Sequence, residues 1–123
     1  MEFVSTNKAP QAIGPYSQAV IANGMLFSSG QIALTPEGQM VEEDIEKQTR
    51  QVLTNLTNVL AEAGTDLSKV VKTGIFLANM DDFTIVNEIY AEFFGSHKPA
   101  RSTVAVKTLP KNALVEIECI ALV

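Results

Sequence analysis

Residues 99–123 read PARSTVAVKTLPKNALVEIECIALV, and this stretch decides the fold. The pattern predicts two strands, one opening just after Pro99 and one running to Val123. Proline disfavours helix at its own position and at the residue before it, so the chain around Arg101 is expected to be extended. A turn at Pro110-Lys111-Asn112 is expected to join the two strands into a C-terminal hairpin.

Side chains of the second strand alternate between two faces, because strand geometry repeats every two residues. One face is wholly apolar and consists of Val115, Ile117, Cys119, Ala121 and Val123. The opposite face is apolar except for two neighbouring carboxylates, and consists of Leu114, Glu116, Glu118, Ile120 and Leu122. A solvent-exposed face would not carry Leu, Ile and Leu, and an ordinary core would not carry Glu. The second face therefore needs a partner.

Arg101 and Glu116 are the first candidate pair for a functional site. On neighbouring strands, an arginine and a glutamate can bracket a small anionic ligand. The guanidinium grips a carboxylate through two parallel hydrogen bonds, and the glutamate handles protons or water. The alternative is that Arg101 pairs with a glutamate at the surface, an interaction worth roughly 0–1 kcal/mol. The residue pattern alone favours this structural alternative.

Composition restricts the class of protein. A chain of 123 residues that is 46% hydrophobic and 19% charged fits one domain spanning residues 1–123. No apolar run approaches the roughly 20 residues that span a bilayer, and the first residues lack the basic and apolar regions of a signal peptide. The single cysteine excludes an internal disulfide framework and favours the cytoplasm. One His and one Cys cannot furnish a zinc cluster, and a net charge of −5 offers no basic surface for nucleic acid.

The rest of the chain predicts a hairpin, two helices and a further strand. Asn23-Gly24 supplies the positive-φ pair of a tight hairpin turn between residues 20–22 and 25–29. Apolar residues at helical spacing predict a helix over 44–63, which Gly64 would end. A buried strand is expected at 70–77. A second helix is expected over 82–94, with Asp81 as its cap and Gly95 as its end.

Four further residues are candidates for a site, each with a structural alternative. Tyr16 follows a Gly-Pro turn and is either a loop aromatic packed on the core or the wall of a pocket. Ser29 and Gly30 end the first hairpin, where they either present a hydroxyl and open amides to an anion or form a strand exit. Asn87 shares the buried stripe of the second helix and needs a hydrogen-bond partner, either backbone or ligand. His97 is expected to be an exposed loop residue.

The element order is β-β-α-β-α-β-β, which predicts an α+β domain with a largely antiparallel sheet and both helices on one face. Nothing in the chain is left to cover the other face, which carries Leu114, Ile120 and Leu122. Self-association with cyclic symmetry is the economical way to cover it. A site built by Arg101 or Glu116 would then lie between subunits.

Five segments together resemble the RidA (YjgF-like) family of reactive-intermediate deaminases. They are Gly14-Pro15-Tyr16-Ser17-Gln18-Ala19, Ser29-Gly30-Gln31, Asn87-Glu88-Ile89-Tyr90, and the pair formed by Pro99-Ala100-Arg101-Ser102 and Glu116-Ile117-Glu118. The resemblance spans nearly the whole chain in the same order. It implies a chorismate-mutase-like α+β fold and a homotrimer, whose three sheets form a central barrel with sites in the clefts between subunits.

The resemblance also implies an activity and roles for the candidate residues. The reaction is hydrolysis of 2-aminoacrylate and 2-iminobutanoate, which are enamine/imine intermediates, to 2-keto acids and ammonia without a cofactor or metal. Arg101 would hold the substrate carboxylate and Glu116 would position the attacking water. Tyr16, Ser29 with Gly30, and Asn87 would line the cleft, one or more of them from a neighbouring subunit.

The sequence departs from the family at Thr103, where many members carry cysteine, so thiol-based regulation at that position is not expected. Three rival functions stay open at this point. One is a non-catalytic regulatory protein that binds small carboxylates with the same fold. The second is RNA cleavage, which the acidic charge disfavours. The third is chorismate mutase activity, for which a single basic residue is too few to hold a dicarboxylate.

Overall fold

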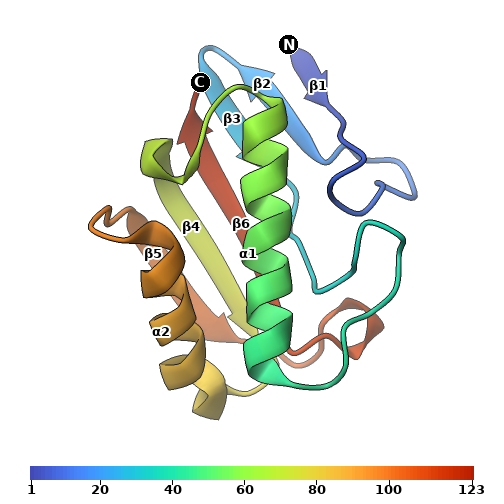
Figure 1. The fold of residues 1–123 in the computed structure, drawn as a ribbon, viewed down its shortest axis with the longest axis vertical. Coiled ribbons are helices and arrows are strands. Elements are labelled where there is room, and N and C mark those ends of the chain that lie inside the picture. The colour runs from blue at the N-terminus through green and yellow to red at the C-terminus, as the bar shows by residue number, and fades with distance from the viewer.

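A six-stranded sheet with two helices on one face forms the architecture of this protein (Figure 1). The computed structural model describes residues 1–123. The strand order is β1-β2-β3-β6-β4-β5, and every pair is antiparallel except β4 with β5. The strands are β1 (Glu2–Val4), β2 (Ala19–Ala22), β3 (Met25–Ser28), β4 (Val70–Leu77), β5 (Ala100–Ala105) and β6 (Val115–Leu122). The predicted α+β class, with both helices on one face of the sheet, is therefore confirmed.

The first hairpin forms as predicted, and one strand was missed. Asn23 and Gly24 have φ values of 52° and 73°, the left-handed pair that a tight turn between β2 and β3 requires. β1 pairs with β2 at the edge of the sheet and was not predicted. Three residues are too few for an alternating pattern to indicate a strand.

The predicted C-terminal hairpin is wrong, because β4 lies between β5 and β6. β4 pairs in parallel with β5 on one side and antiparallel with β6 on the other. The connection from β4 to β5 passes through α2, as parallel neighbours require a long crossover. Pro110–Asn112 forms a short 3-10 turn on the way to β6, in which Lys111 has φ 55° and ψ 28°.

Both predicted helices are present, α1 over Ile45–Glu62 and α2 over Phe83–Phe94. Asp44 caps α1 by accepting a hydrogen bond from the Lys47 amide at 2.9 Å. The prediction of Asp81 as the cap of α2 is wrong. A 3-10 turn over Met80–Asp82 precedes the helix, and Asn79 caps that turn by accepting from the Asp81 amide.

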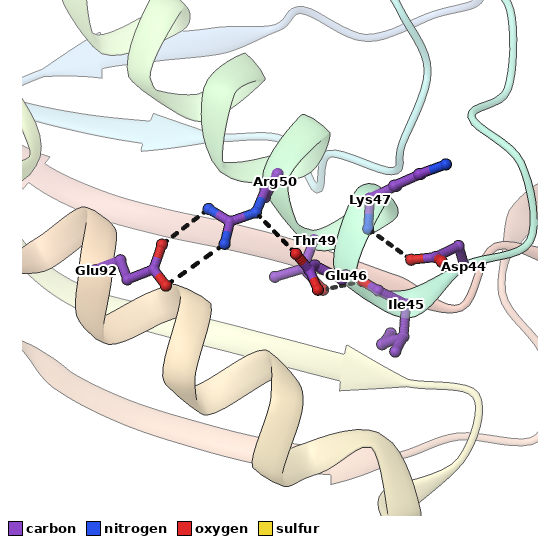
Figure 2. A network of polar contacts seen from close by, with 7 residues as sticks. All are labelled: Asp44, Ile45, Glu46, Lys47, Thr49, Arg50 and Glu92. Carbon is purple, nitrogen blue, oxygen red and sulfur yellow. Dashed lines mark hydrogen bonds and ion pairs between the residues drawn. The ribbon is translucent and has the colours of Figure 1, made fainter.

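Exposed polar side chains join the two helices on their outer side (Figure 2). Arg50 of α1 donates from Nη1 to Glu92 Oε2 of α2 at 2.8 Å, and its Nε lies 3.6 Å from Glu46 Oε1 one turn earlier. These groups lie in solvent, where such pairs contribute little to stability. The helices are therefore held to the sheet mainly by their buried apolar stripes.

The core lies between the helices and the facing side of the sheet. The prediction that alternating residues of β6 are buried is confirmed for Val115, Ile117, Cys119 and Ala121. Val123 lies beyond the strand and is exposed. The other side of the sheet has no helix over it (Figure 1). Its apolar side chains include Phe3, which is 71% exposed, and Leu122, which is 48% exposed. We call this side the open face.

No helix is both long and apolar enough to cross a bilayer.

Candidate functional site

Glu116 of β6 reaches into a pocket of about 550 Å³ next to the end of β3. One wall is irregular chain from the segment between β1 and β2 and includes Ile13 and Tyr16, which are 86% and 55% exposed. Another wall is formed by the residues that follow β3. Lys111, from the turn before β6, also lines the pocket. Three residues predicted from the sequence, Tyr16, Ser29 and Gly30, therefore share this pocket with Glu116.

Ser29 and Gly30 interrupt the pairing of β3 with β6. Before them, Ser28 Oγ accepts from the Cys119 amide at 2.9 Å. After them, Gln31 exchanges two backbone hydrogen bonds with Ile117. The strand-exit alternative is thus correct for the backbone, and the interruption places two residues at the Glu116 pocket.

The amide and hydroxyl of Ser29 are engaged within the chain, so the alternative in which they are open to an anion does not hold for this residue. Its amide donates to the Gln18 carbonyl at 2.9 Å and its hydroxyl to the Ser17 carbonyl at 2.6 Å. No hydrogen bond of the chain uses the Gly30 amide. The donor available to a ligand at this corner is therefore the amide of Gly30.

Gly30 is required here by the close approach of Glu116. A Cβ at residue 30 would lie 2.4 Å from Glu116 Oε2 and 2.8 Å from its Cδ. With Glu116 in the role expected from the sequence, we expect Gly30→Ala to displace its carboxylate by about 1 Å and to lower kcat of the expected imine hydrolysis about 100-fold, because a misplacement of 1 Å has effects of this size. Steady-state kinetics of the purified variant measure this effect. Gly74→Ala is the matched control, since its Cβ would crowd Glu118 instead, at 3.2 Å from Cγ. Equal kcat in Gly30→Ala and the native chain would contradict the assigned importance of the Glu116 position.

Arg101 occupies a second pocket, of about 370 Å³, beneath the C-terminal part of α2. Its Nη1 donates to Asn87 Oδ1 at 2.7 Å. The guanidinium carbon lies 4.9 Å from the ring centre of Tyr90 and 5.4 Å from that of Phe83. These contacts hold the planar guanidinium group through one nitrogen and through its faces. Its other N–H groups are left for a ligand carboxylate. Asn87 is half-buried, and its partner is a site residue instead of backbone.

His97 lines the same pocket and corrects a further prediction. It was expected to be an exposed loop residue, but it is half-buried and its Nε2 lies 2.6 Å from the Val70 carbonyl oxygen. This contact ties the loop after α2 to the start of β4. The imidazole is therefore engaged with the backbone at that nitrogen.

Arg101 and Glu116 do not bracket one ligand within a single chain. Arg101 pairs in register with Thr73, whose side chain is buried on the helix side, whereas Glu116 pairs with Phe76 and belongs to the open face. The two side chains thus stand on opposite faces of the sheet with β4 between their strands. One chain carries two half-sites, one with Arg101 and Asn87 and one with Glu116, Tyr16, Ser29 and Gly30.

The carboxyl of Glu116 is electrostatically perturbed. Partial burial, and secondarily the charge of Glu118 two residues along β6, raise its pKa above the usual value of 4.5. A base with a raised pKa accepts a proton more readily near neutral pH. Burial also raises the pKa of the Cys119 thiol, to about 11, so that this cysteine is not a nucleophile. No three His, Cys, Asp or Glu side chains gather in an arrangement that could hold a metal ion.

Lys111 and Gln18 are among the residues of the Glu116 pocket that were not predicted as site residues from the sequence. Lys111 lies in the turn before β6, where its left-handed backbone gives no pattern that periodicity detects. Gln18 is 3% exposed. It follows the Gly-Pro turn within the family motif Gly14–Ala19, which gave it no role, and by itself it was a polar residue directly before a strand.

The sequence family described as "Endoribonuclease L-PSP" matches residues 6–123, nearly the whole chain. The chain belongs to this family, the RidA (YjgF-like) family. "Reactive Intermediate Deaminase A, chloroplastic" of Arabidopsis thaliana is 56% identical over 121 residues, which are 98% of this chain and 65% of that protein. The human "2-iminobutanoate/2-iminopropanoate deaminase" is 46% identical over 120 residues, which are 97% of this chain and 88% of that protein.

A solved structure of the conserved Rid protein family from Yersinia pestis superimposes on this chain with a TM-score of 0.98. It is 56% identical, and the match covers 99% of this chain and 98% of that one. The arrangement of the sheet and helices, including the missed β1 and the position of β4 between β5 and β6, is therefore that of a Rid protein. The two half-sites described above are built on the Rid fold.

Proposed function

We propose that this Rid-family chain hydrolyses enamine/imine intermediates, 2-aminoacrylate and 2-iminobutanoate, to 2-keto acids and ammonia. The relatives named as deaminases support this activity. The observation that carries it is the pairing of chemical groups in the two half-sites. Arg101 offers free N–H groups to a single carboxylate, and Glu116 is a carboxylate of raised pKa beside an open backbone amide.

The proposed chemistry needs only positioning and proton transfer. The substrate carboxylate binds Arg101, which places the protonated imine carbon, already electrophilic, against a water held by Glu116. As the water oxygen bonds to carbon, its proton passes to the Glu116 carboxylate. The same proton then moves to the nitrogen of the tetrahedral adduct. As the C–N bond breaks, the hydroxyl of the adduct gives its proton to Glu116, which passes it to the departing ammonia, so that the products are a 2-keto acid and ammonium. No electrons are exchanged, so the reaction needs no redox cofactor.

The proposed assembly is a chorismate-mutase-like homotrimer with three sheets around a central barrel. The open face supports it, because exposed apolar side chains gathered on one side of a sheet mark an interaction surface. These side chains include Phe3, Phe27, Val104 and Leu122. The separation of Arg101 from Glu116 by β4 supports it as well. In the trimer, the Arg101 half-site of one subunit faces the Glu116 half-site of its neighbour.

A coupled assay tests the proposed activity. A pyridoxal-phosphate serine/threonine dehydratase generates the enamine/imine, and its decay is followed together with the appearance of the 2-keto acid. We expect faster decay when the wild-type chain is present, in proportion to its concentration. Decay at the uncatalysed rate with a well-folded, assembled protein would contradict the deaminase. The cleft would then be a carboxylate-binding site.

The pH dependence follows from the state of Glu116. The carboxylate form is the active base, so turnover falls as pH decreases through its pKa. Because that pKa is raised by burial and by Glu118, the acidic limb of kcat lies above pH 4.5. Glu118→Gln removes the second cause, and we expect the limb to move to lower pH. An acidic limb that stays in place in this variant would contradict the coupling of the two carboxylates.

A further inference from the structure

The wall of the Glu116 pocket opposite β6 is irregular chain, and one buried side chain holds it. Residues 5–18 contain no strand or helix, although the segment from Pro10 to Tyr16 lines the pocket. Irregular backbone exposes unpaired amides and carbonyls that water or side chains must satisfy. The carboxamide of Gln18 satisfies several of them at once.

The Gln18 carboxamide binds the chain at and before the start of this wall, from Thr6 to Pro10. Its Oε1 accepts from the Thr6 amide at 2.7 Å, and its Nε2 donates to the Pro10 carbonyl at 2.7 Å and to the Thr6 carbonyl at 3.1 Å. A longer contact reaches the Ala9 carbonyl at 3.5 Å. The side chain is 3% exposed, so water cannot replace these hydrogen bonds when it is removed.

The backbone of Gln18 connects the same wall to the opposite side of the pocket. Its carbonyl accepts from the Ser29 amide at 2.9 Å, directly before Gly30. A single residue thus fixes the loop on one side and the strand exit beside Glu116 on the other. The positions of the loop and of the strand exit beside Glu116 therefore both depend on Gln18.

We propose that Gln18 is a positioning residue for Glu116, which acts by holding the wall from Pro10 to Tyr16 in place beside the carboxylate. Its effect on catalysis rests on the proposed deaminase function. Its effect on the environment of Glu116 does not. The charged groups around Glu116 are Glu118 on its own strand and Lys111 in the turn before β6. Neither contacts the Gln18 carboxamide.

The test is Gln18→Met in the assembled protein, because methionine keeps the length of the side chain and removes the hydrogen bonds of the carboxamide. The first measurement is the titration of the Glu116 carboxyl carbon by ¹³C NMR. Loosening the wall admits water, so the raised pKa of Glu116 is expected to move down toward 4.5. The second measurement is deaminase kinetics. We expect kcat to fall about 10- to 100-fold while KM changes less, since Arg101 is untouched.

Gln48→Met is the matched control. Gln48 is 2% exposed and also ties irregular chain through its carboxamide, by donating to the Val41 and Glu42 carbonyls and accepting from the Leu114 amide. It lines a different pocket, on the side of Lys107 and Leu109. We expect a comparable loss of stability, a Glu116 titration unchanged from wild type, and kcat within about twofold.

A milder variant keeps the proposal testable if Gln18→Met does not fold. Asn58 of α1 ties the same loop from outside by donating to the Lys8 carbonyl at 2.8 Å. Asn58→Leu is expected to shift the Glu116 titration in the same direction by a smaller amount. The proposal is overturned if Gln18→Met changes the Glu116 titration and kcat no more than Gln48→Met does. If Gln18→Met does not fold, the same comparison is made between Asn58→Leu and Gln48→Met. A wild-type chain without deaminase activity would overturn the proposed function alone, because the titration still reports on the wall.

Discussion

Glu116→Gln is expected to lower turnover of 2-iminobutanoate by 10²- to 10⁴-fold while leaving carboxylate binding nearly unchanged. The amide has the size of the carboxylate but cannot accept the proton of the attacking water, and loss of a positioned base has effects of about this size. The coupled dehydratase assay measures turnover. Calorimetric titration with 2-oxobutanoate measures binding, which depends on Arg101 in the other half-site.

Glu118→Gln is the matched control, since Glu118 lies on the same face of β6 and carries the same charge but points over Gly74. It should retain most of the turnover near neutral pH. Native turnover in Glu116→Gln would show that this carboxylate is not the base. If the wild type binds 2-oxobutanoate but shows no turnover, the alternative of a non-catalytic carboxylate-binding protein would be favoured.

Arg101→Ala is expected to lower kcat/KM about 100-fold or more. A bidentate, charge-assisted grip on the substrate carboxylate is lost, and each hydrogen bond to a charged group contributes about 1.5–3 kcal/mol. Arg101→Lys keeps the charge but not the planar fork that contacts Asn87 Oδ1 and lies near Tyr90. We therefore expect the lysine variant to recover only a small part of the loss.

Arg50→Ala provides the comparison for a second arginine of the chain. Arg50 is paired with Glu92 on the outer side of the helices and is exposed to solvent (Figure 2). Its removal should leave kcat/KM within about twofold of wild type. Arg101 variants with native kcat/KM would remove the proposed carboxylate grip. The substrate would then have to be held by another group of the cleft.

The parts of the fold that depend on neighbouring residues were predictable from the sequence. The Asn23-Gly24 turn and α1 were predicted correctly, because each is determined by a few adjacent residues. The alternating burial of β6 was also predicted correctly for the residues within the strand. The order of the strands was not, since β4 carries an apolar pattern that does not specify which strand pairs on either side. Pairing is a tertiary property.

The candidate site was predictable in its residues but not in its geometry. All six candidates line one of two pockets, and the resemblance to the Rid family identified them. Their distribution over opposite faces of the sheet follows from the register with β4, which the predicted hairpin had left out. Arg101 pairs with Thr73 and Glu116 with Phe76, and residues three apart on a strand point to opposite faces. Gln18 was missed because its role depends on the path of an irregular loop rather than on a periodic pattern.

The most direct test of the central claim, that each site uses Arg101 from one subunit and Glu116 from the next, is complementation between two inactive variants. Arg101→Ala and Glu116→Gln are unfolded together in equal amounts, refolded and assayed, with each variant refolded alone as the control. Random assembly places an intact Arg101 opposite an intact Glu116 at about a quarter of the interfaces. We predict recovery of about a quarter of wild-type turnover. Mixed trimers, verified by native mass spectrometry, that show no turnover above the single variants would contradict the shared site.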